Sequence, residues 1–345
     1  MQQTSIELEG QLCGAVPDDR GPIGGGPGYS ATIAPPDNAL GDIDDLLEAL
    51  AQARSGDVVY IAGTAEIDCT TRVYIEELVL ELPGGVTLAS DRGIDGSPGA
   101  LLVSDTFKTR PLLQATGPGV RLTGLRLQGP NPKRHLYHHN RSFKEGRGHS
   151  YYYAFPTSAG IITQYAGLQV DNCELSGWSY AAVSLEEGDD HHIHHNSIHH
   201  NQYNGLGYGV CHGVAQSLIE RNLFDYNRHS IAGNGRSGSG YEACHNIELG
   251  TSLSHCFDMH GGRDRKDETD IAGTWMQIHH NTFCCPQAAV VIRGTPEKGA
   301  DIYNNWFHQR PDERSVVAQG RTQIRTNAYG LEDSVFRAAA VPQER

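Results

Sequence analysis

Short stretches of alternating apolar and polar residues recur along the chain. Each ends in an asparagine followed by further apolar positions, as in SLIERNLF and ADIYNNWF. Copies of this phrase are centred on Asn172, Asn196, Asn222, Asn246, Asn281, Asn305 and Asn327. Successive asparagines lie 24, 26, 24, 35, 24 and 22 residues apart. A nearly fixed period of this length predicts a repeat architecture.

Each repeat is too small to fold alone. It holds short strands with polar or glycine corners, and it has no amphipathic stretch of helical length. One unit cannot bury its apolar face, whereas stacked units can. The pattern therefore predicts an all-β solenoid of parallel strands that rises by about 4.8 Å per coil. We expect the asparagine to recur because a turn residue tolerates the left-handed conformation and hydrogen-bonds to the adjacent coil.

The N-terminal part follows a different pattern. Residues 1–40 are rich in Gly and Pro and predict an extended arm, and the GPIGGGPG segment lacks the flanking strand and helix of a nucleotide-binding loop. Residues 41–56 predict a helix, after which a strand is expected over Val58–Ile61. The apolar face of this helix consists of Ile43, Leu46, Leu47, Leu50 and Ala51.

The period, the asparagine phrase and the entry helix together resemble the right-handed parallel β-helix of the pectate-lyase-like superfamily, over roughly residues 41–330. In that superfamily such a helix caps the open end of the solenoid. We therefore expect one domain, with an arm over 1–40, a capping helix over 41–56, a parallel β-helix over 57–330 and a tail over 331–345.

The histidine-rich run DDHHIHHNSIHH overlaps one repeat phrase. His194 and His195 precede Asn196 as other histidines precede Asn246 and Asn281, so these positions follow the repeat. We interpret them as ladders stacked on the outside of the coils rather than as a metal site. The residues left as metal candidates are Asp189, Asp190 and His191, which precede the phrase.

Two interruptions of the period predict inserted loops, over residues 129–160 and 261–275. The first loop interleaves basic and aromatic residues within an acidic protein, a combination that suits an anionic sugar chain. The substrate-binding candidates are Lys133, Arg134, Tyr137, Arg141, Lys144, Arg147, Tyr151 and, from the second loop, Arg263. A solvated loop without this role, or a decorated turn in the second case, is the alternative.

Composition limits the partners. The formal net charge of −14 argues against nucleic acids and anionic membranes, and no apolar stretch has the length of a membrane span. The eight cysteines form no CxxC pair, so we expect buried free thiols rather than a zinc cluster. No signal peptide is evident, which fits either a cytoplasmic protein or a mature secreted one. The oligomeric state stays open.

Twelve residues after successive asparagines, one strand position holds Ser184, Tyr208, Asp258 and Arg293. The intervening coil brings Arg228 and His229 to the start of that strand, and His255 and His260 flank Asp258. Uronate lyases and C5-epimerases remove a proton α to a carboxylate, and they need a cation, a base and a proton donor. The predicted catalytic residues are Tyr208 as donor, His229 or His260 as base, Asp258, and Arg228, Arg263 or Arg293 as the cation.

The segment FDMHGG resembles the Asp-x-His segment of β-helix mannuronan C5-epimerases, with Met259 where that family has proline. The sequence thus predicts a lyase or epimerase that acts on an acidic polysaccharide. It requires no cofactor, although β-helix lyases often use Ca²⁺, which would need oxygen ligands.

Two alternatives remain open. Polygalacturonases share the fold and hydrolyse with paired carboxylates, for which Asp189–Asp190 and His212–Gly213 are a partial match. A non-catalytic carbohydrate-binding β-helix is the other.

Overall fold

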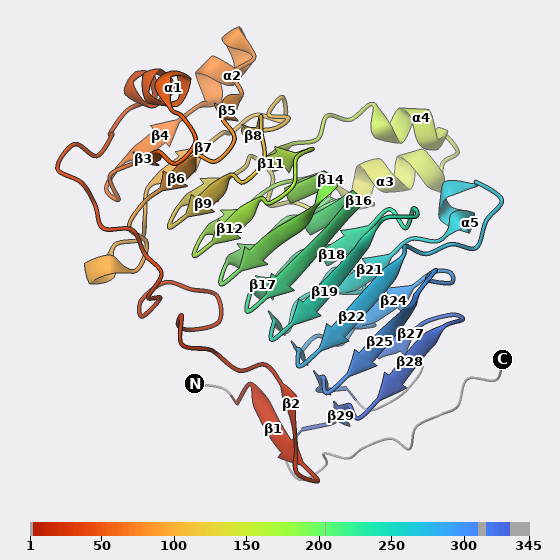
Figure 1. The fold of residues 1–345 in the computed structure, drawn as a ribbon. Coiled ribbons are helices and arrows are strands. Elements are labelled where there is room, and N and C mark those ends of the chain that lie inside the picture. The colour runs from red at the N-terminus through yellow and green to blue at the C-terminus, as the bar shows by residue number, and fades with distance from the viewer. Residues whose placement is uncertain (1–2, 204, 310–314, 332–345) are drawn as a thin grey trace.

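The protein winds into a stack of parallel-stranded coils. This architecture is seen in a computed structural model that describes residues 3–203, 205–309 and 315–331 (Figure 1). Each full coil contributes one strand to each of three successive runs of parallel strands, which we call the first, second and third sheets in chain order. The predicted parallel β-helix is therefore confirmed. Apart from residue 331, the predicted tail lies outside the described residues.

The sheets contain short strands because each coil turns a corner every few residues. The first sheet comprises β5 (Leu80–Leu82), β8 (Leu113–Ala115), β11 (Ala159–Thr163), the first halves of β14 (Ala181–His194) and β16 (Tyr208–Glu220), β18 (His229–Gly233), β21 (Phe257–Met259), β24 (Val290–Ile292) and β27 (Val316–Val317). The second comprises β3 (Val58–Tyr60), β6 (Thr87–Ala89), β9 (Arg121–Thr123), β12 (Gln169–Asp171), the second halves of β14 and β16, β19 (Gly240–Cys244), β22 (Trp275–His279), β25 (Gly299–Tyr303) and β28 (Thr322–Arg325).

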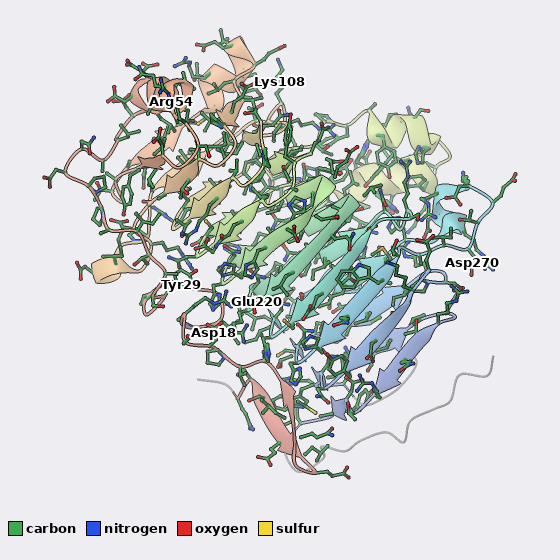
Figure 2. The ribbon with its side chains drawn as sticks, in the orientation of Figure 1. Asp18, Tyr29, Arg54, Lys108, Glu220 and Asp270 are labelled. Atoms are coloured by element: carbon green, nitrogen blue, oxygen red, sulfur yellow. The ribbon has the colours of Figure 1, made fainter. Side chains whose placement is uncertain are left out.

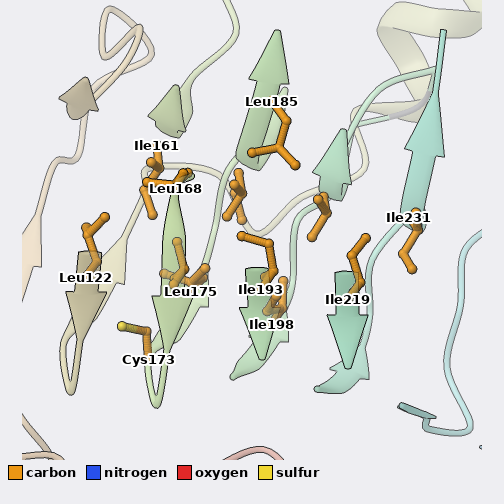
Figure 3. Packing of buried hydrophobic residues seen from close by; sticks show 14 of the residues in the cluster. Leu122, Ile161, Leu168, Cys173, Leu175, Leu185, Ile193, Ile198, Ile219 and Ile231 are labelled. Carbon is orange, nitrogen blue, oxygen red and sulfur yellow. The ribbon is translucent and has the colours of Figure 1, made fainter. Parts of the chain in front are cut away.

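The third sheet follows the asparagine corner. It comprises β4 (Glu66–Asp68), β7 (Leu101–Val103), β10 (Arg126–Gln128), β13 (Glu174–Ser176), β15 (Ser197–His199), β17 (Leu223–Asp225), β20 (Ile247–Glu248), β23 (Thr282–Phe283), β26 (Trp306–Phe307) and β29 (Ala328–Tyr329). Inward side chains of all three sheets stack coil upon coil into one continuous apolar core, part of which Figure 3 shows.

The recurring asparagines form a buried hydrogen-bonded ladder. The side-chain oxygen of Asn222 accepts from the backbone N–H and from the side-chain amide of Asn196, both at 3.0 Å. Its own amide donates to the Ile193 carbonyl oxygen at 2.8 Å and to the Asn246 side-chain oxygen at 3.0 Å. The same pattern continues through Asn281 and Asn305. Each asparagine thus ties its coil to both neighbours.

The sequence-based explanation of this asparagine is wrong in one respect. The left-handed residue is the one before it: His195, Arg221, His245, His280, Asn304 and Thr326 have φ between 51° and 55°. In the first copy Asn172 itself has φ 53°, and Cys173 takes the ladder position, where its N–H donates to Asn196. The asparagine recurs for its two-sided amide, whereas the preceding residue makes the turn.

Helices lie at one end and along one side of the stack (Figure 1). Helix α1 (Ile43–Gln52) packs Leu46 and Leu50 into the core, and its N-cap Asp42 accepts from the N–H groups of Asp44 and Asp45. It is shorter than the predicted 41–56. The other helices are α2 (Thr70–Glu76), the 3₁₀ turn η1 (Ile94–Gly96), α3 (Leu136–Phe143), α4 (Gly148–Tyr153) and α5 (Gly262–Arg265). The predicted insertions at 129–160 and 261–275 contain α3 with α4, and α5.

The N-terminal arm begins with a hairpin, β1 (Ser5–Leu8) and β2 (Gln11–Gly14), and then follows the asparagine corner across several coils (Figure 1). Arg20 bonds Glu220 at 2.6 Å, and the Tyr29 hydroxyl donates to Asp171 at 3.0 Å. Figure 2 labels Tyr29 and Glu220 close to Asp18 of the arm. At Gly25, φ is +66° and an added Cβ would lie 2.3 Å from the His195 carbonyl oxygen, so only glycine allows this approach.

The arm changes the interpretation of the histidine run. His194 and His195 were expected on the outer surface, but both are buried, and His195 Nε2 lies 3.2 Å from Asp18 of the arm. The histidine-ladder interpretation holds in part, since the His245 and His280 rings of successive coils stack with centroids 5.1 Å apart and His279 stacks on Tyr303. These histidines serve the attachment of the arm and the stacking of coils.

Six of the eight cysteines are buried, and Cys256 Sγ lies 2.7 Å from Cys285 Sγ. Within the part of the chain that the structure describes, none of the helices has the length and apolarity needed to traverse a membrane.

Candidate active site

A carboxylate without solvent exposure lies on the outer side of the first sheet. Asp258 is the middle residue of β21, and its neighbours Phe257 and Met259 belong to the core, so Asp258 points outward. It is nevertheless completely buried beneath side chains from adjoining turns. Because a buried charge is costly without partners, its surroundings indicate what it is for.

Three side chains bind this carboxylate. His255 Nε2 lies 3.0 Å from Oδ1, and His260 Nε2 lies 3.0 Å from Oδ2. Arg293 donates from Nε to Oδ1 at 3.0 Å and from Nη2 to Oδ2 at 2.7 Å. Burial alone would raise the pKa of Asp258, but the hydrogen bonds from His255 and His260 hold it well below its usual range. Asp258 is therefore ionised and orients the groups around it.

Tyr208, Arg228 and His229 form an adjoining cluster at the start of β16 and β18. The Tyr208 and His229 rings are stacked, with centroids 5.8 Å apart and planes at 6°, and the Arg228 guanidinium lies 5.9 Å from the Tyr208 ring centre. His229 Nε2 is 3.9 Å from Asp258 Oδ2, which joins this cluster to the carboxylate. The predicted catalytic residues Tyr208, Arg228, His229, Asp258, His260 and Arg293 thus lie around one site.

The two histidines considered as bases differ in accessibility. His229 is completely buried, and its Nδ1 donates to the His255 carbonyl oxygen at 2.5 Å. Burial, and then the charge of Arg228, hold its pKa well below the usual range, so the ring is neutral. The His260 side chain is 30% exposed. Of the two candidate bases named from the sequence, His260 is thus the one with an exposed side chain.

Tyr208 is a neutral phenol at the edge of the site. Its hydroxyl donates to the Gly205 carbonyl oxygen at 3.2 Å, and only 6% of the residue is exposed. Burial raises the pKa of Tyr208, while Arg228 acts in the opposite direction. The hydroxyl therefore retains its proton at neutral pH and is suited to donating it.

The predicted alignment of Ser184, Tyr208, Asp258 and Arg293 in one strand position holds for Ser184 and Asp258 but is wrong for Tyr208 and Arg293. Asp258 is level with Ala232, Cys211 and Ser184 on successive coils. Tyr208 is level with His229, three residues earlier along the strand, and Arg293 lies beyond Val291, the partner of Asp258. The connections after the ladder asparagines differ in length, so a constant count of twelve fails. The residues meet because long side chains lean along the strands.

Of the predicted substrate-binding residues in the first insertion, some line a pocket and others do not. Arg134 and Lys144 line a pocket together with Arg228. Arg141 lies over the Tyr137 ring at 5.6 Å and Arg147 over the Tyr151 ring at 5.2 Å, which places cations against aromatic faces along α3 and α4. These pairs, and the exposed Lys133, do not line that pocket. Their contact with substrate stays a prediction.

The second insertion supplies a residue that the sequence did not suggest. Asp264 in α5 lies 3.3 Å from Arg293 Nη1, so it helps to hold the guanidinium that binds Asp258. Arg263 lies on the exposed side of α5, in a surface hollow with Lys266, Glu268 and Asp270. Arg265 donates to the carbonyl oxygens of Asn234 and Ile271 and fastens the loop.

The metal candidates named from the sequence do not gather. Asp189 and Asp190 are exposed, whereas His191 is buried, with Nδ1 accepting from Leu168 N–H and Nε2 donating to the Glu187 carbonyl oxygen. Among the described residues, two other groups place three ligand atoms within 4.8 Å: His229 with His255 and Asp258, and Glu242 with Cys244 and His279. Both contain histidine nitrogens, which suit Ca²⁺ poorly. In the first group, moreover, Arg293 already neutralises Asp258.

One of the residues considered for hydrolysis, His212, has a structural role. His212 is buried, its Nδ1 lies 3.2 Å from the Ala232 carbonyl oxygen, and its Nε2 lies 2.6 Å from the Ser217 hydroxyl. Both ring nitrogens are thus engaged by the protein. This histidine lends no support to the hydrolase alternative.

Comparison with known proteins gives a likeness at the level of the fold. No protein-family model matches the chain, and a search of curated proteins finds no match. Among solved structures, an alginate lyase from Paenibacillus sp. str. FPU-7 is similar, with a TM-score of 0.55 and 14% sequence identity. The likeness covers 84% of this chain and 94% of that one. At this identity it shows a shared fold and does not by itself transfer an activity.

Proposed function

We propose that this protein is a polysaccharide lyase that cleaves a uronate-containing chain by removing the proton α to the carboxylate. The observation that carries the proposal is the buried Asp258 carboxylate, which orients the accessible His260 and is linked through His229 to a neutral tyrosine and an arginine. The shared fold with an alginate lyase supports the same substrate class. It makes an anionic polysaccharide the expected partner.

The base in this proposal is His260. Its Nε2 bears a proton when it donates to Asp258, so Nδ1 keeps a lone pair, and the side chain is 30% exposed. A carboxylate that fixes the tautomer of a histidine also stabilises the cation formed when that histidine accepts a proton. His229 then acts as a positioning residue, since its ring packs between Tyr208 and His255.

The cation that stabilises the developing charge is Arg228. Removing an α proton places negative charge on the substrate carboxylate, and an unneutralised carboxylate would make this step too slow. Arg293 was an equal candidate from the sequence, but both prongs of its guanidinium bind Asp258. Arg228 Nη1, by contrast, is buried and has no hydrogen-bond partner among the described residues.

Tyr208 is the acid. As His260 takes the C5 proton, the electron pair forms the C4=C5 double bond, the C4–O4 bond breaks, and the departing oxygen takes the proton of the Tyr208 hydroxyl. Proton return from His260 to Tyr208 through solvent restores the resting state. No water is consumed, so the product keeps an unsaturated uronate at its new non-reducing end.

The test follows the ultraviolet absorbance of that double bond during incubation with a panel of polyuronates and neutral glycans. We expect the absorbance to rise with a polyuronate, and Tyr208→Phe and His260→Gln each to slow the rise by about 10²-fold or more. Tyr226→Phe is the matched control, because Tyr226 is half-exposed and stacks on His200 at another corner of the coil. Flat absorbance across the polyuronates would refute the proposal.

An epimerase would use the same groups but reprotonate C5 from the opposite face. Exchange of the C5 proton in heavy water without new ultraviolet absorbance would identify that outcome.

A further inference from the structure

A pocket of about 320 Å³ lies between α3 and the turns that follow the third sheet. Leu136, His139 and Asn140 of α3, with Arg134 and Lys144 on either side of that helix, form one wall. Gly205, Arg228, Leu253 and Ser254 form the other. The volume is at the lower end of the range of about 300–1,000 Å³ for small-ligand sites, which suits a single sugar ring.

The lining is strongly cationic. Arg134, Lys144 and Arg228 all border the pocket, and none of the described residues that line it is acidic. The chain as a whole has a net charge of −14, so this concentration of positive charge runs against the composition. A ligand that carries negative charge would be attracted into the pocket and would find no opposing carboxylate there.

Three buried polar atoms of the lining residues have no hydrogen-bond partner among the described residues: Arg228 Nη1, His139 Nδ1 and Asn140 Oδ1. Buried polar groups are nearly always satisfied in folded proteins, so atoms left over at a pocket indicate a ligand that completes them. Arg228 offers a donor, whereas the Asn140 oxygen requires one. Burial, and then the charge of Arg228, lower the pKa of His139, so its ring offers neutral polar nitrogens.

This mixture distinguishes between anions. A uronate ring carries one carboxylate for the cationic side chains and several hydroxyl donors for the Asn140 oxygen, whereas hydrogen phosphate has a single hydroxyl donor and no ring to fill the pocket. Arg228 links the pocket to the proposed active site, because its guanidinium, which lines the pocket, also lies 5.9 Å from the Tyr208 ring centre. A sugar in the pocket is therefore next to the one that reacts at Tyr208.

We propose that this pocket is a subsite for the uronate residue adjacent to the scissile one, with Arg134 and Lys144 binding its carboxylate. The proposal rests on the proposed function, since it assumes a polyuronate chain, and it adds a determinant of specificity. Arg228 is shared between the two sugars, so occupation of the subsite by a charged residue also positions the cation used in the reaction.

The experiment measures binding and needs no turnover. Glucuronate, galacturonate and mannuronate, each beside its uncharged amide, and inorganic phosphate are titrated into the full-length protein by ligand-observed NMR. We expect at least one uronate to bind about tenfold more tightly than its amide, and Arg134→Ala and Lys144→Ala each to weaken that binding about tenfold. Both side chains are exposed, so these variants should fold.

Lys108→Ala is the control for lost charge, because Lys108 is exposed and does not line the pocket. It should leave uronate binding within about twofold, the ordinary scatter of a surface substitution. Equal binding of a uronate and its amide, unchanged binding in both variants, or displacement of the uronate by phosphate would each overturn the proposal. The expected binding pattern without lyase turnover would refute the proposed function alone. Turnover with unchanged variant binding would refute the subsite alone.

Discussion

Glu248 provides a test of how strongly burial inside the coils disfavours an ionised carboxyl group. It is the last residue of β20 and only 1% exposed. Burial, opposed by the Ser230 side chain and reinforced by Asp225, raises its pKa from an ordinary 4.5 to about 8. In the folded protein Glu248 therefore holds its proton through most of the physiological range, whereas the unfolded chain releases it near pH 4.5.

The sign and size of the effect follow from this difference. Between pH 4.5 and 8 the folded state binds one more proton than the unfolded state, so stability falls as pH rises, by about 1.4 kcal/mol per pH unit. The contribution of Glu248 to the free energy of unfolding is fully present below pH 4.5 and is lost as pH rises through about 8. Between pH 5 and pH 9 the expected loss is about 4 kcal/mol. Glu248→Gln keeps the shape but does not titrate, so this loss should disappear.

The assay is the free energy of unfolding in urea at several pH values from 5 to 9. Other titrating groups contribute equally to both proteins, so the quantity of interest is the difference between wild type and Glu248→Gln. That difference should grow by about 4 kcal/mol across the range. Glu66→Gln, at an exposed position of the same sheet, should follow the wild type. Parallel curves for wild type and Glu248→Gln would refute the reasoning.

Three further substitutions have defined outcomes. Asn246→Ala removes four ladder hydrogen bonds, so the free energy of unfolding in urea should fall by about 4 kcal/mol. Gln277→Ala, at an exposed position, should change it by under about 0.5 kcal/mol. Equal effects of the two substitutions would contradict the role of the asparagine ladder. Asp258→Asn leaves Arg293 without its anion, so the free energy of unfolding measured by thermal denaturation should fall by about 2–4 kcal/mol. Turnover should fall about 10²-fold. Turnover equal to that of the wild type would exclude this carboxylate from the site. Gly25→Val forces a side chain against a coil carbonyl, so limited proteolysis should cleave the arm faster than in the wild type; unchanged cleavage would show that the arm tolerates a side chain there.

The repeat pattern was sufficient to predict the fold because the ladder asparagine is a local requirement. Each copy must hydrogen-bond to both neighbours, so the residue recurs at nearly fixed spacing wherever coils stack. The alternation of apolar and polar residues, which directs the apolar side chains into the core, is likewise visible in the sequence of each strand. The exchange of Asn172 for Cys173 at the ladder position was invisible to counting, because the phrase still contained an asparagine one residue earlier.

The site was predicted as a set of residues but not as an arrangement. Tyr208, His229, Asp258 and Arg293 were found by counting along coils, yet their true register depends on corner lengths that vary between coils. The accessibility of the side chains could not be predicted either, because nothing in the sequence distinguishes the buried His229 from the partly exposed His260. The contribution of Asp264 depends on how the second insertion folds back over β24, which no local pattern encodes.

The central claim is that a uronate chain is cleaved by elimination, without addition of water. Its most direct test is mass spectrometry of the products formed from a polyuronate in water enriched in heavy oxygen. The account predicts that the products with the new non-reducing end are lighter by one water than the corresponding hydrolysis products, and that cleavage itself introduces no heavy oxygen. Products that carry a full complement of water and the heavy label would contradict it and establish a hydrolase on this fold.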